Sequence, residues 1–456
     1  MFSVNTQKNY IYLLIAALIG LVVAAAVYDT TLFAAVVIVI IVFVIFVKNP
    51  ELALAILFNG TLIYFYVVYK LGFQTSRTLT GGFYGFLAYS FLLAEVLLLS
   101  KKHINFRLSF VDILFLIFFS LFFLSYLAFS TDNDNAYSKI IYAPLLAIAP
   151  YLGARLLLSE RRIKNFFKYS VFIAAMLMIP AFYELFTRFL AQRPRFSMYF
   201  FENANAAKDN PILFGSTYAT LLIIIFVWAF ECARFRLRYF VPVAISAYFV
   251  LLSGSRGVMI SFVAAIIFYL FVVSKKRLRT KIYASIFMLL MFFSVYKLFI
   301  PQRLDDFYKY SLSANARQDT TSSIQIRTSK WERAICDFAE NPIIGVGTGN
   351  SDNRSGYPHN IVLEVAAEFG VLGLFVFALL CYTVVRKATI FLKNKQLSNS
   401  HMLMRLLLVL FIYMLTHAMF SGYIANHVCL YICMGLIVCL DNLQTTLPVS
   451  SKISPE

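Results

Sequence analysis

The residues best suited to chemistry lie in the second half of the chain, beside a long polar stretch. His359 follows a proline and precedes Asn360, and a neutral imidazole can accept a proton near physiological pH. Proline and asparagine are also common where helices begin. The sequence therefore leaves two interpretations open here: a general base at His359, or only the start of a helix.

Two arginines could hold an anion near such a base, because a guanidinium fork matches two phosphate oxygens. Arg256 lies in a Ser-Arg-Gly turn between two apolar runs, and Arg327 lies in the polar stretch, four residues before Trp331. Arg256 could instead extend to lipid headgroups, and Arg327 could simply face water. Arg193 and Arg195, in a shorter polar segment upstream, are further candidates for substrate binding.

Glu364 and Glu368 are four residues apart, and on a helix they would share one face with Asn360. Such side chains could orient a substrate, so Asn360, Glu364 and Trp331 are candidate binding residues. The alternative is structural pairing with a neighbouring helix, and this alternative is preferred for Glu368.

The polar stretch 301–359 contains one predicted helix, over residues 324–340, in which apolar residues recur at helical spacing. An Asn-Pro pair follows and would end it, because proline disfavours helix in the residue before it. Three alternate glycines begin at Gly345. No strand precedes them and no Lys-Ser or Lys-Thr pair follows, so they indicate a turn rather than a nucleotide loop. Such a turn would bring His359 toward the predicted helix.

Other polar residues have simpler explanations. Asp132 and Asp134 form an Asp-x-Asp pair that could bind a metal, but ordinary acidic loop composition is the preferred interpretation. His417 and His427 are interpreted as polar packing residues. Of the six cysteines only Cys336 falls in the polar stretch, which excludes a disulfide framework there.

The elements that must position these residues are membrane helices. Hydrophobic residues make up 61% of the 456-residue chain and charged residues only 14%. Long apolar runs without strand-like alternation indicate transmembrane helices. The predicted fold is therefore an all-α, polytopic transmembrane bundle of about fourteen spans. If the two short spans around Arg256 form one broken pair, the number falls to about twelve. The predicted spans are 10–27, 31–47, 51–69, 82–99, 110–129, 139–158, 166–190, 212–230, 238–253, 257–273, 281–300, 360–385, 404–422 and 426–441.

The charge pattern predicts the orientation of these spans. The net charge of +18 comes from basic clusters that lie in alternate loops, as in cytoplasmic loops of membrane proteins. Both termini are therefore predicted to be cytoplasmic, the first span to be an uncleaved signal anchor, and the loop 301–359 to be periplasmic. No basic domain with interleaved aromatics is present, which argues against a nucleic-acid partner.

Taken together, the motifs resemble the O-antigen ligase and polymerase superfamily. The resemblance rests on the run from Asn341 to Asn350, on Pro-His-Asn-Ile-Val-Leu-Glu ending at Glu364, and on Glu-Phe-Gly-Val-Leu-Gly beginning at Glu368. Arg256 and Arg327 are similar to the two arginines of that family. These motifs cover roughly residues 250–375, whereas the N-terminal half is similar only in being polytopic.

The resemblance implies a GT-C-like membrane glycosyltransferase of the bacterial inner membrane, with its active site on the periplasmic face. The implied donor is a glycan on undecaprenyl diphosphate. The acceptor is lipid A–core for a ligase or a second lipid-linked glycan for a polymerase, and the ligase is preferred. No cofactor or metal is implied, and direct attack predicts inversion. The implied catalytic residues are His359, Arg256 and Arg327.

One departure from the family pattern bears on the choice of acceptor. Many ligases carry a second histidine two positions before the catalytic one, where this chain has Tyr357. The predicted organisation is an N-terminal bundle over 1–250, a catalytic core over 251–385, and C-terminal spans with a cytoplasmic tail over 386–456. A transporter of lipid-linked oligosaccharides is the alternative class. It would place charged residues along a central cavity with paired broken helices, whereas this chain gathers them beside one loop.

Overall fold

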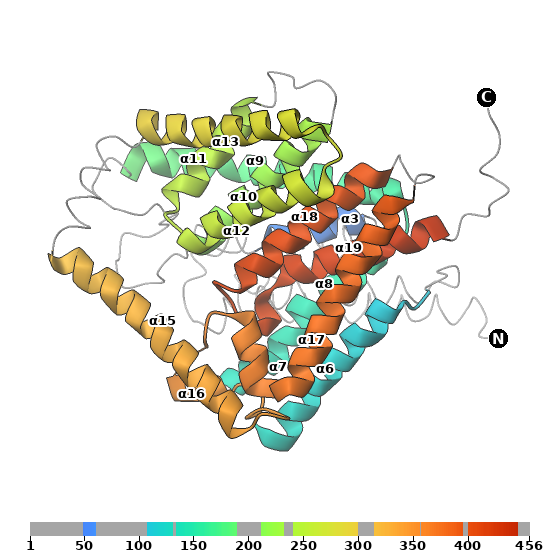
Figure 1. The fold of residues 1–456 in the computed structure, drawn as a ribbon, viewed down its shortest axis with the longest axis vertical. Helices are drawn as coiled ribbons and strands as arrows, with labels where there is room; N and C mark the ends of the chain where they lie inside the picture. Colours follow the sequence, from blue (N-terminus) through green and yellow to red (C-terminus); the bar gives the residue numbers. More distant parts are fainter. Residues whose placement is uncertain are drawn as a thin grey trace, which may run out of the picture.

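The computed structural model of the chain describes residues 49–60, 107–130, 134–188, 211–231, 240–299, 314–355, 357–394 and 400–445. Within these ranges the fold is all-helical, which confirms the predicted class. Figure 1 shows the helices α10, α11, α12 and α13 gathered at one side of the molecule and α6, α8, α17 and α19 at the other, with α18 between the two groups.

The helices have the following bounds. They are α3 (Pro50–Phe58), α6 (Phe110–Phe129), α7 (Asp134–Ala143), α8 (Ala149–Arg155), α9 (Glu160–Arg188), α10 (Pro211–Glu231), α11 (Phe240–Leu252), α12 (Arg256–Phe268), α13 (Leu278–Phe299), α15 (Ala314–Glu340), α16 (Asn350–Ser355), α17 (Ile361–Lys393), α18 (His401–Ala418) and α19 (Val428–Thr445). Three short turns complete the set: η1 (Pro144–Ile148), η3 (Tyr269–Val273) and η5 (Ile424–Asn426).

Five described helices are long and apolar enough to cross a membrane. They are Phe110–Phe129, Phe214–Glu231, Arg256–Val273, Ile361–Lys393 and His401–Ala418, and each overlaps a predicted span. The predicted spans 10–27, 31–47 and 82–99 lie outside the described residues, as do Arg193, Arg195 and Asp132. The span count and the orientation of the termini therefore stay predictions.

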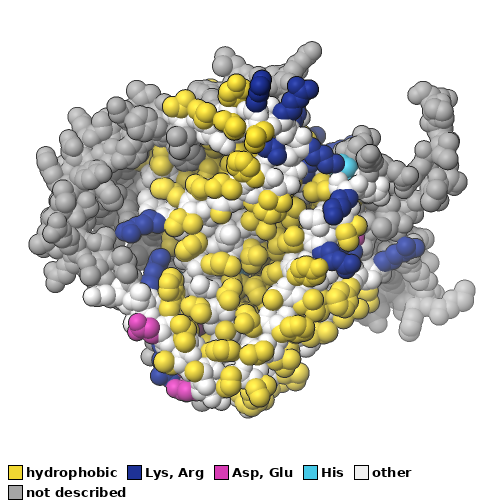
Figure 2. Space-filling view, viewed as in Figure 1, with side chains coloured by type: hydrophobic (Ala, Val, Ile, Leu, Met, Phe, Trp, Pro, Cys, Tyr) yellow, Lys and Arg dark blue, Asp and Glu magenta, His cyan; other side chains and the backbone are white. Residues whose placement is uncertain are grey.

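Large apolar side chains cover the outer surfaces of these helices. On α6 they include Leu116, Leu124 and Leu127, which are 52%, 60% and 78% exposed. Figure 2 shows hydrophobic side chains spread widely over the described surface, with Lys and Arg side chains mostly near its edges. A face of this kind suits contact with lipid chains. The chain is a multi-pass membrane protein.

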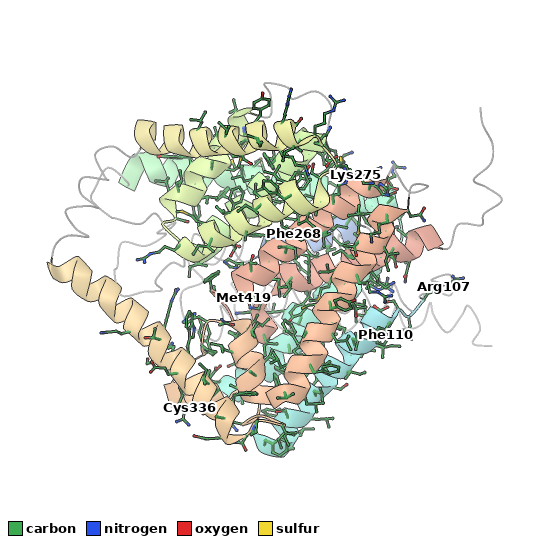
Figure 3. The ribbon with its side chains drawn as sticks, in the orientation of Figure 1. Arg107, Phe110, Phe268, Lys275, Cys336 and Met419 are labelled. Atoms are coloured by element: carbon green, nitrogen blue, oxygen red, sulfur yellow. The ribbon has the colours of Figure 1, made fainter. Side chains whose placement is uncertain are left out.

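The predicted loop helix is present and longer than expected. α15 runs from Ala314 to Glu340, so the prediction of 324–340 is confirmed at its end and is ten residues short at its start. It ends just before the Asn-Pro pair. In Figure 1 α15 extends along one edge of the bundle, across the direction of α6. In Figure 3 Cys336 on α15 lies on the opposite side of the bundle from Arg107 and Lys275.

α17 does not enter the bundle as one straight helix, contrary to the predicted span 360–385. Gly370 has φ 62° and ψ −158°, which breaks the helix after Phe369. A glycine tolerates this conformation because it has no Cβ. Residues 361–369 therefore form a separate short helix. The long apolar part begins at Val371 and ends at Lys393.

Candidate functional site

The glycine-rich turn 341–350 satisfies the backbone groups that the break in α17 releases. Val346 N donates to Ala367 O at 2.9 Å, and Gly347 N donates to Glu368 O at 3.2 Å. In the other direction Val371 N donates to Pro342 O at 2.8 Å. A broken helix in a membrane protein requires such partners, because unpaired buried backbone groups are costly.

The turn needs its glycines for two reasons. Gly345, Gly347 and Gly349 all have positive φ, between 74° and 98°. In addition, a Cβ on Gly345 would lie 2.3 Å from the carbonyl carbon of Glu368, and one on Gly349 would lie 2.6 Å from Ala136. The turn is thus a close-packed structural element, and the sequence-based rejection of a nucleotide loop agrees with this role.

Residues at the start of the short helix hold it in place. Asn360 is its N-cap, and Asn360 Oδ1 accepts from Val362 N at 3.0 Å and from Leu363 N at 3.2 Å. Trp331 Nε1 of α15 donates to Pro358 O at 2.8 Å. The helix cap considered for Asn360 is therefore present. Trp331 connects α15 directly to the residue before His359.

His359 itself is held in a strained conformation. Its φ is +54°, a region that side-chain-bearing residues seldom occupy, and such strain gathers at functional sites. The ring of Tyr357 packs on the imidazole with centroids 3.9 Å apart. Within the described residues His359 Nδ1 is buried and has no hydrogen-bond partner. The imidazole is thus fixed by packing rather than by a hydrogen bond to Nδ1.

Basic residues of α15 face this histidine. Burial, followed by the charges of Lys330 and Arg327, lowers the pKa of His359 from 6.5 to about 4. Lys330 Nζ also lies 5.5 Å from the centroid of the Tyr357 ring. Arg327 and Lys330 are three residues apart, on one face of the helix. His359 is therefore neutral at pH 7 and lies in a positive field.

Arg256 lies on another helix, next to the connection between α18 and α19. It is exposed at the first position of α12. A Cβ on the next residue, Gly257, would lie 2.7 Å from Phe420, in the connection between α18 and α19. In Figure 3 Met419, which starts this connection, lies beside α12. In the described part of the chain no carboxylate pairs with Arg256, Arg327 or Lys330.

Glu364 and Glu368 have a lysine partner from α7. Lys139 Nζ lies 2.6 Å from Glu364 Oε1, 2.5 Å from Glu368 Oε1 and 3.0 Å from Asp352 Oδ2. The structural pairing preferred for Glu368 is thus observed, and it includes Glu364. The three carboxylates each offer an oxygen within 4.8 Å of the others, a spacing that could hold a metal ion. In this structure the ammonium of Lys139 lies against all three.

Two residues of the site, Lys139 and Lys330, were not predicted from the sequence. Lys139 is a lone lysine at the start of a predicted apolar span, and an ionisable residue there is a signal of function. Lys330 lies one helical turn after Arg327 and could have been found by its spacing. The interpretation of His417 and His427 as packing residues agrees with the burial of both side chains.

These observations define the class of the protein: an all-helical, multi-pass membrane protein with a polar site beside one long surface helix. A family model described as O-antigen ligase matches residues 241–378. This segment contains Arg256, α15, the glycine-rich turn and His359, and it is similar to the O-antigen ligase family. The match confirms the resemblance seen in the motifs. No curated protein matches the chain.

Proposed function

We propose that the protein is a membrane glycosyltransferase that transfers a glycan from undecaprenyl diphosphate to an acceptor hydroxyl on the periplasmic face. Support comes chiefly from one observation: a neutral, strained His359 lies beside Arg327 and Lys330, which pair with no carboxylate of the described residues, inside the segment matched by the O-antigen ligase model. The preferred acceptor is lipid A–core, which would make the protein an O-antigen ligase.

The chemistry of such a transfer fits these residue types. His359 takes the proton of the acceptor hydroxyl as its oxygen bonds to the anomeric carbon. The bond from that carbon to the lipid diphosphate breaks, and the electron pair leaves on the diphosphate oxygen. Arg256, Arg327 and Lys330 stabilise this negative charge, because preplaced cations act where charge develops. Attack from the opposite side inverts the anomeric carbon, and no metal ion is required.

The decisive test is transfer in reconstituted vesicles. Purified protein, a lipid-linked glycan donor and lipid A–core are incubated with and without a chelator. Formation of glycosylated lipid A–core that is insensitive to the chelator is expected. Absence of transfer to any acceptor from folded protein would contradict the proposed function. Loss of transfer on chelation would contradict metal independence and direct attention to Asp132 and Asp134.

A polymerase is the second candidate, and Tyr357 favours it. This residue stands where many ligases have a second histidine, and here its ring packs on His359. A polymerase would use a second lipid-linked repeat as acceptor. Glycan profiles of a deletion strain separate the two: loss of a ligase leaves long lipid-linked chains unattached, whereas loss of a polymerase leaves single repeats on the core.

Replacement of Arg327 with alanine is expected to lower kcat about 10²–10³-fold, as removal of one stabilising donor of a developing anion does elsewhere. Arg327→Lys should recover only part of this, because lysine lacks the bidentate fork. Arg333→Ala is the matched control on the same helix, since Arg333 pairs with Asp337 at 2.9 Å. Initial rates against donor concentration check this, and equal rates for Arg327→Ala and wild type would remove Arg327 from the site.

The acid limb of the pH–rate profile is expected to differ between kcat/KM and kcat. In free enzyme the pKa of His359 is about 4, so kcat/KM should fall as the pH drops through about 4 and the imidazole protonates. A bound diphosphate offsets the charges of Lys330 and Arg327, so the limb in kcat should lie at higher pH.

The charge of Lys330 can be removed to test this assignment. Lys330→Gln takes away a cation that disfavours the imidazolium, so the pKa of His359 should rise and the acid limb of kcat/KM should move upward. Rate profiles from pH 3.5 to 8, measured on matched amounts of folded protein, give the acid limb of kcat/KM and that of kcat. A limb that does not move in Lys330→Gln would show that another group titrates.

A further inference from the structure

Lys139 lies at a buried junction of three segments. Only 2% of its side chain is exposed, and its three carboxylate partners are at most 8% exposed. An ammonium has three hydrogens, so it can donate one to each of Asp352, Glu364 and Glu368. Lys139 thus joins α7 to α16 and to the short helix at the start of α17.

Two of the partners extend this junction further. Glu364 Oε2 accepts from Ile424 N at 2.9 Å, in the connection between α18 and α19. Glu368 Oε1 accepts from Gly349 N at 3.0 Å, in the glycine-rich turn. The position of Lys139 therefore decides how the turn and the connection meet the short helix.

The junction reaches His359 by two routes. Along the chain, Glu364 lies five residues after His359, within the first turn of the short helix. Through space, Lys139 Nζ lies 5.9 Å from the centroid of the Tyr423 ring, which lies 6.0 Å from that of Tyr357. Tyr357 in turn packs on His359. The backbone that follows His359 and the aromatic ring that packs on its imidazole thus both depend on Lys139.

The charges show why a lysine is needed at this place. One ammonium faces three carboxylates, and within the described residues Glu368 Oε2 and Asp352 Oδ1 are buried without a hydrogen-bond partner. Without the ammonium, three carboxylates would face one another at metal-ligand spacing, and like charges in a buried site repel strongly.

We propose that Lys139 is a positioning residue for His359: its ammonium is the resident cation of a three-carboxylate site and thereby fixes the start of α17. Glu364, which the sequence predicted to bind substrate, thus has a structural role in this arrangement.

The position of His359 can be measured without transfer activity. Histidines are modified with diethylpyrocarbonate over a range of pH, and the His359 peptide is quantified by mass spectrometry. In wild type the modification should fall through a midpoint near 4, because burial and the charges of Lys330 and Arg327 disfavour the imidazolium. Tyr357 is the other titratable group that faces the ring.

In folded Lys139→Met the short helix should loosen, and the midpoint for His359 should move toward 6.5. His401 is the internal control, because its Nε2 lies 2.9 Å from Asn394 O, at the far end of α17. A wild-type midpoint for His359 in folded Lys139→Met would overturn the proposal.

A second variant covers the case in which Lys139→Met does not fold. The double variant Lys139→Gln, Glu368→Gln keeps hydrogen-bonding groups at both positions and leaves the net charge of the cluster unchanged. It should fold and return the His359 midpoint close to that of wild type. A folded double variant with a midpoint near 6.5 would count against the proposal, since a hydrogen-bonded cluster of unchanged net charge would then not hold the histidine.

The response of the melting temperature to metal ions separates this proposal from a metal site at the same three carboxylates. The melting temperature of wild type should be unchanged by EDTA and by Mn²⁺. A melting temperature that EDTA lowers and Mn²⁺ restores would overturn the proposal, because a metal would then be the resident cation.

The expected effect of Lys139→Met on catalysis rests on the proposed function. In Lys139→Met the kcat per folded enzyme should fall about 10²-fold, as small misplacements of a catalytic group do. The KM for the donor should change little, because Arg256 and Arg327 are not moved. Equal kcat values for wild type and folded Lys139→Met would overturn the link to catalysis. If wild type transfers no glycan at all, the proposed function fails while the modification result still decides the role of Lys139.

Discussion

His359→Ala is expected to lower the rate of glycan transfer about 10²–10⁴-fold, the usual contribution of a general base. The acceptor hydroxyl is a weak nucleophile, and in the described structure His359 is the histidine that lies beside unpaired cations of α15. Donor binding should be largely kept, because the proposed mechanism assigns the diphosphate to Arg256, Arg327 and Lys330. The expected pattern is therefore a large fall in kcat with a small change in the KM for the donor.

The control for this experiment is another histidine of the same chain. His401 lies at the start of α18 and contacts the carbonyl of Asn394, far along α17 from the site. His401→Ala should keep nearly the full transfer rate, although its melting temperature can fall. If His359→Ala retains full transfer in folded protein, His359 is not the base.

Gly370→Ala is expected to abolish transfer and to destabilise the fold. A Cβ at this position would lie 2.4 Å from the carbonyl carbon of Ile343, and the positive φ of 62° disfavours any residue with a Cβ. The strained backbone alone costs about 1–3 kcal/mol. The contact with backbone atoms adds to this, because neither side can yield as a flexible side chain would. The glycine-rich turn would separate from α17, and the short helix carrying Glu364 would lose its support.

The matched control is the next residue. Val371 is 53% exposed, so Val371→Ala removes little packing and leaves the hydrogen bond from Val371 N to Pro342 O intact. Melting temperature in detergent and transfer per folded protein should both stay near wild type in Val371→Ala and fall in Gly370→Ala. A Gly370→Ala variant with wild-type melting would mean that the turn and α17 adjust together.

Local sequence patterns predicted several elements well. The loop helix ends where the Asn-Pro pair requires, and Asn360 caps the helix that follows. These features depend on a few adjacent residues, so their physical causes are readable from the sequence. The break at Gly370 was not predicted, because the apolar run continues through it and a single glycine is tolerated in many helices. Its cause is a partner, the turn 341–350, whose contact with α17 only the folded chain displays.

The sequence by itself determined that the chain is helical and membrane-embedded, since 61% hydrophobic residues in long runs permit little else in lipid. It also identified His359 and Arg327 as candidates, because those residue types suit proton and phosphate chemistry. Only the tertiary structure decided that Lys139, more than two hundred residues before Glu364, is the partner of both glutamates. Pairing of buried charges depends on which helices meet, and that distance along the chain carries no local signal.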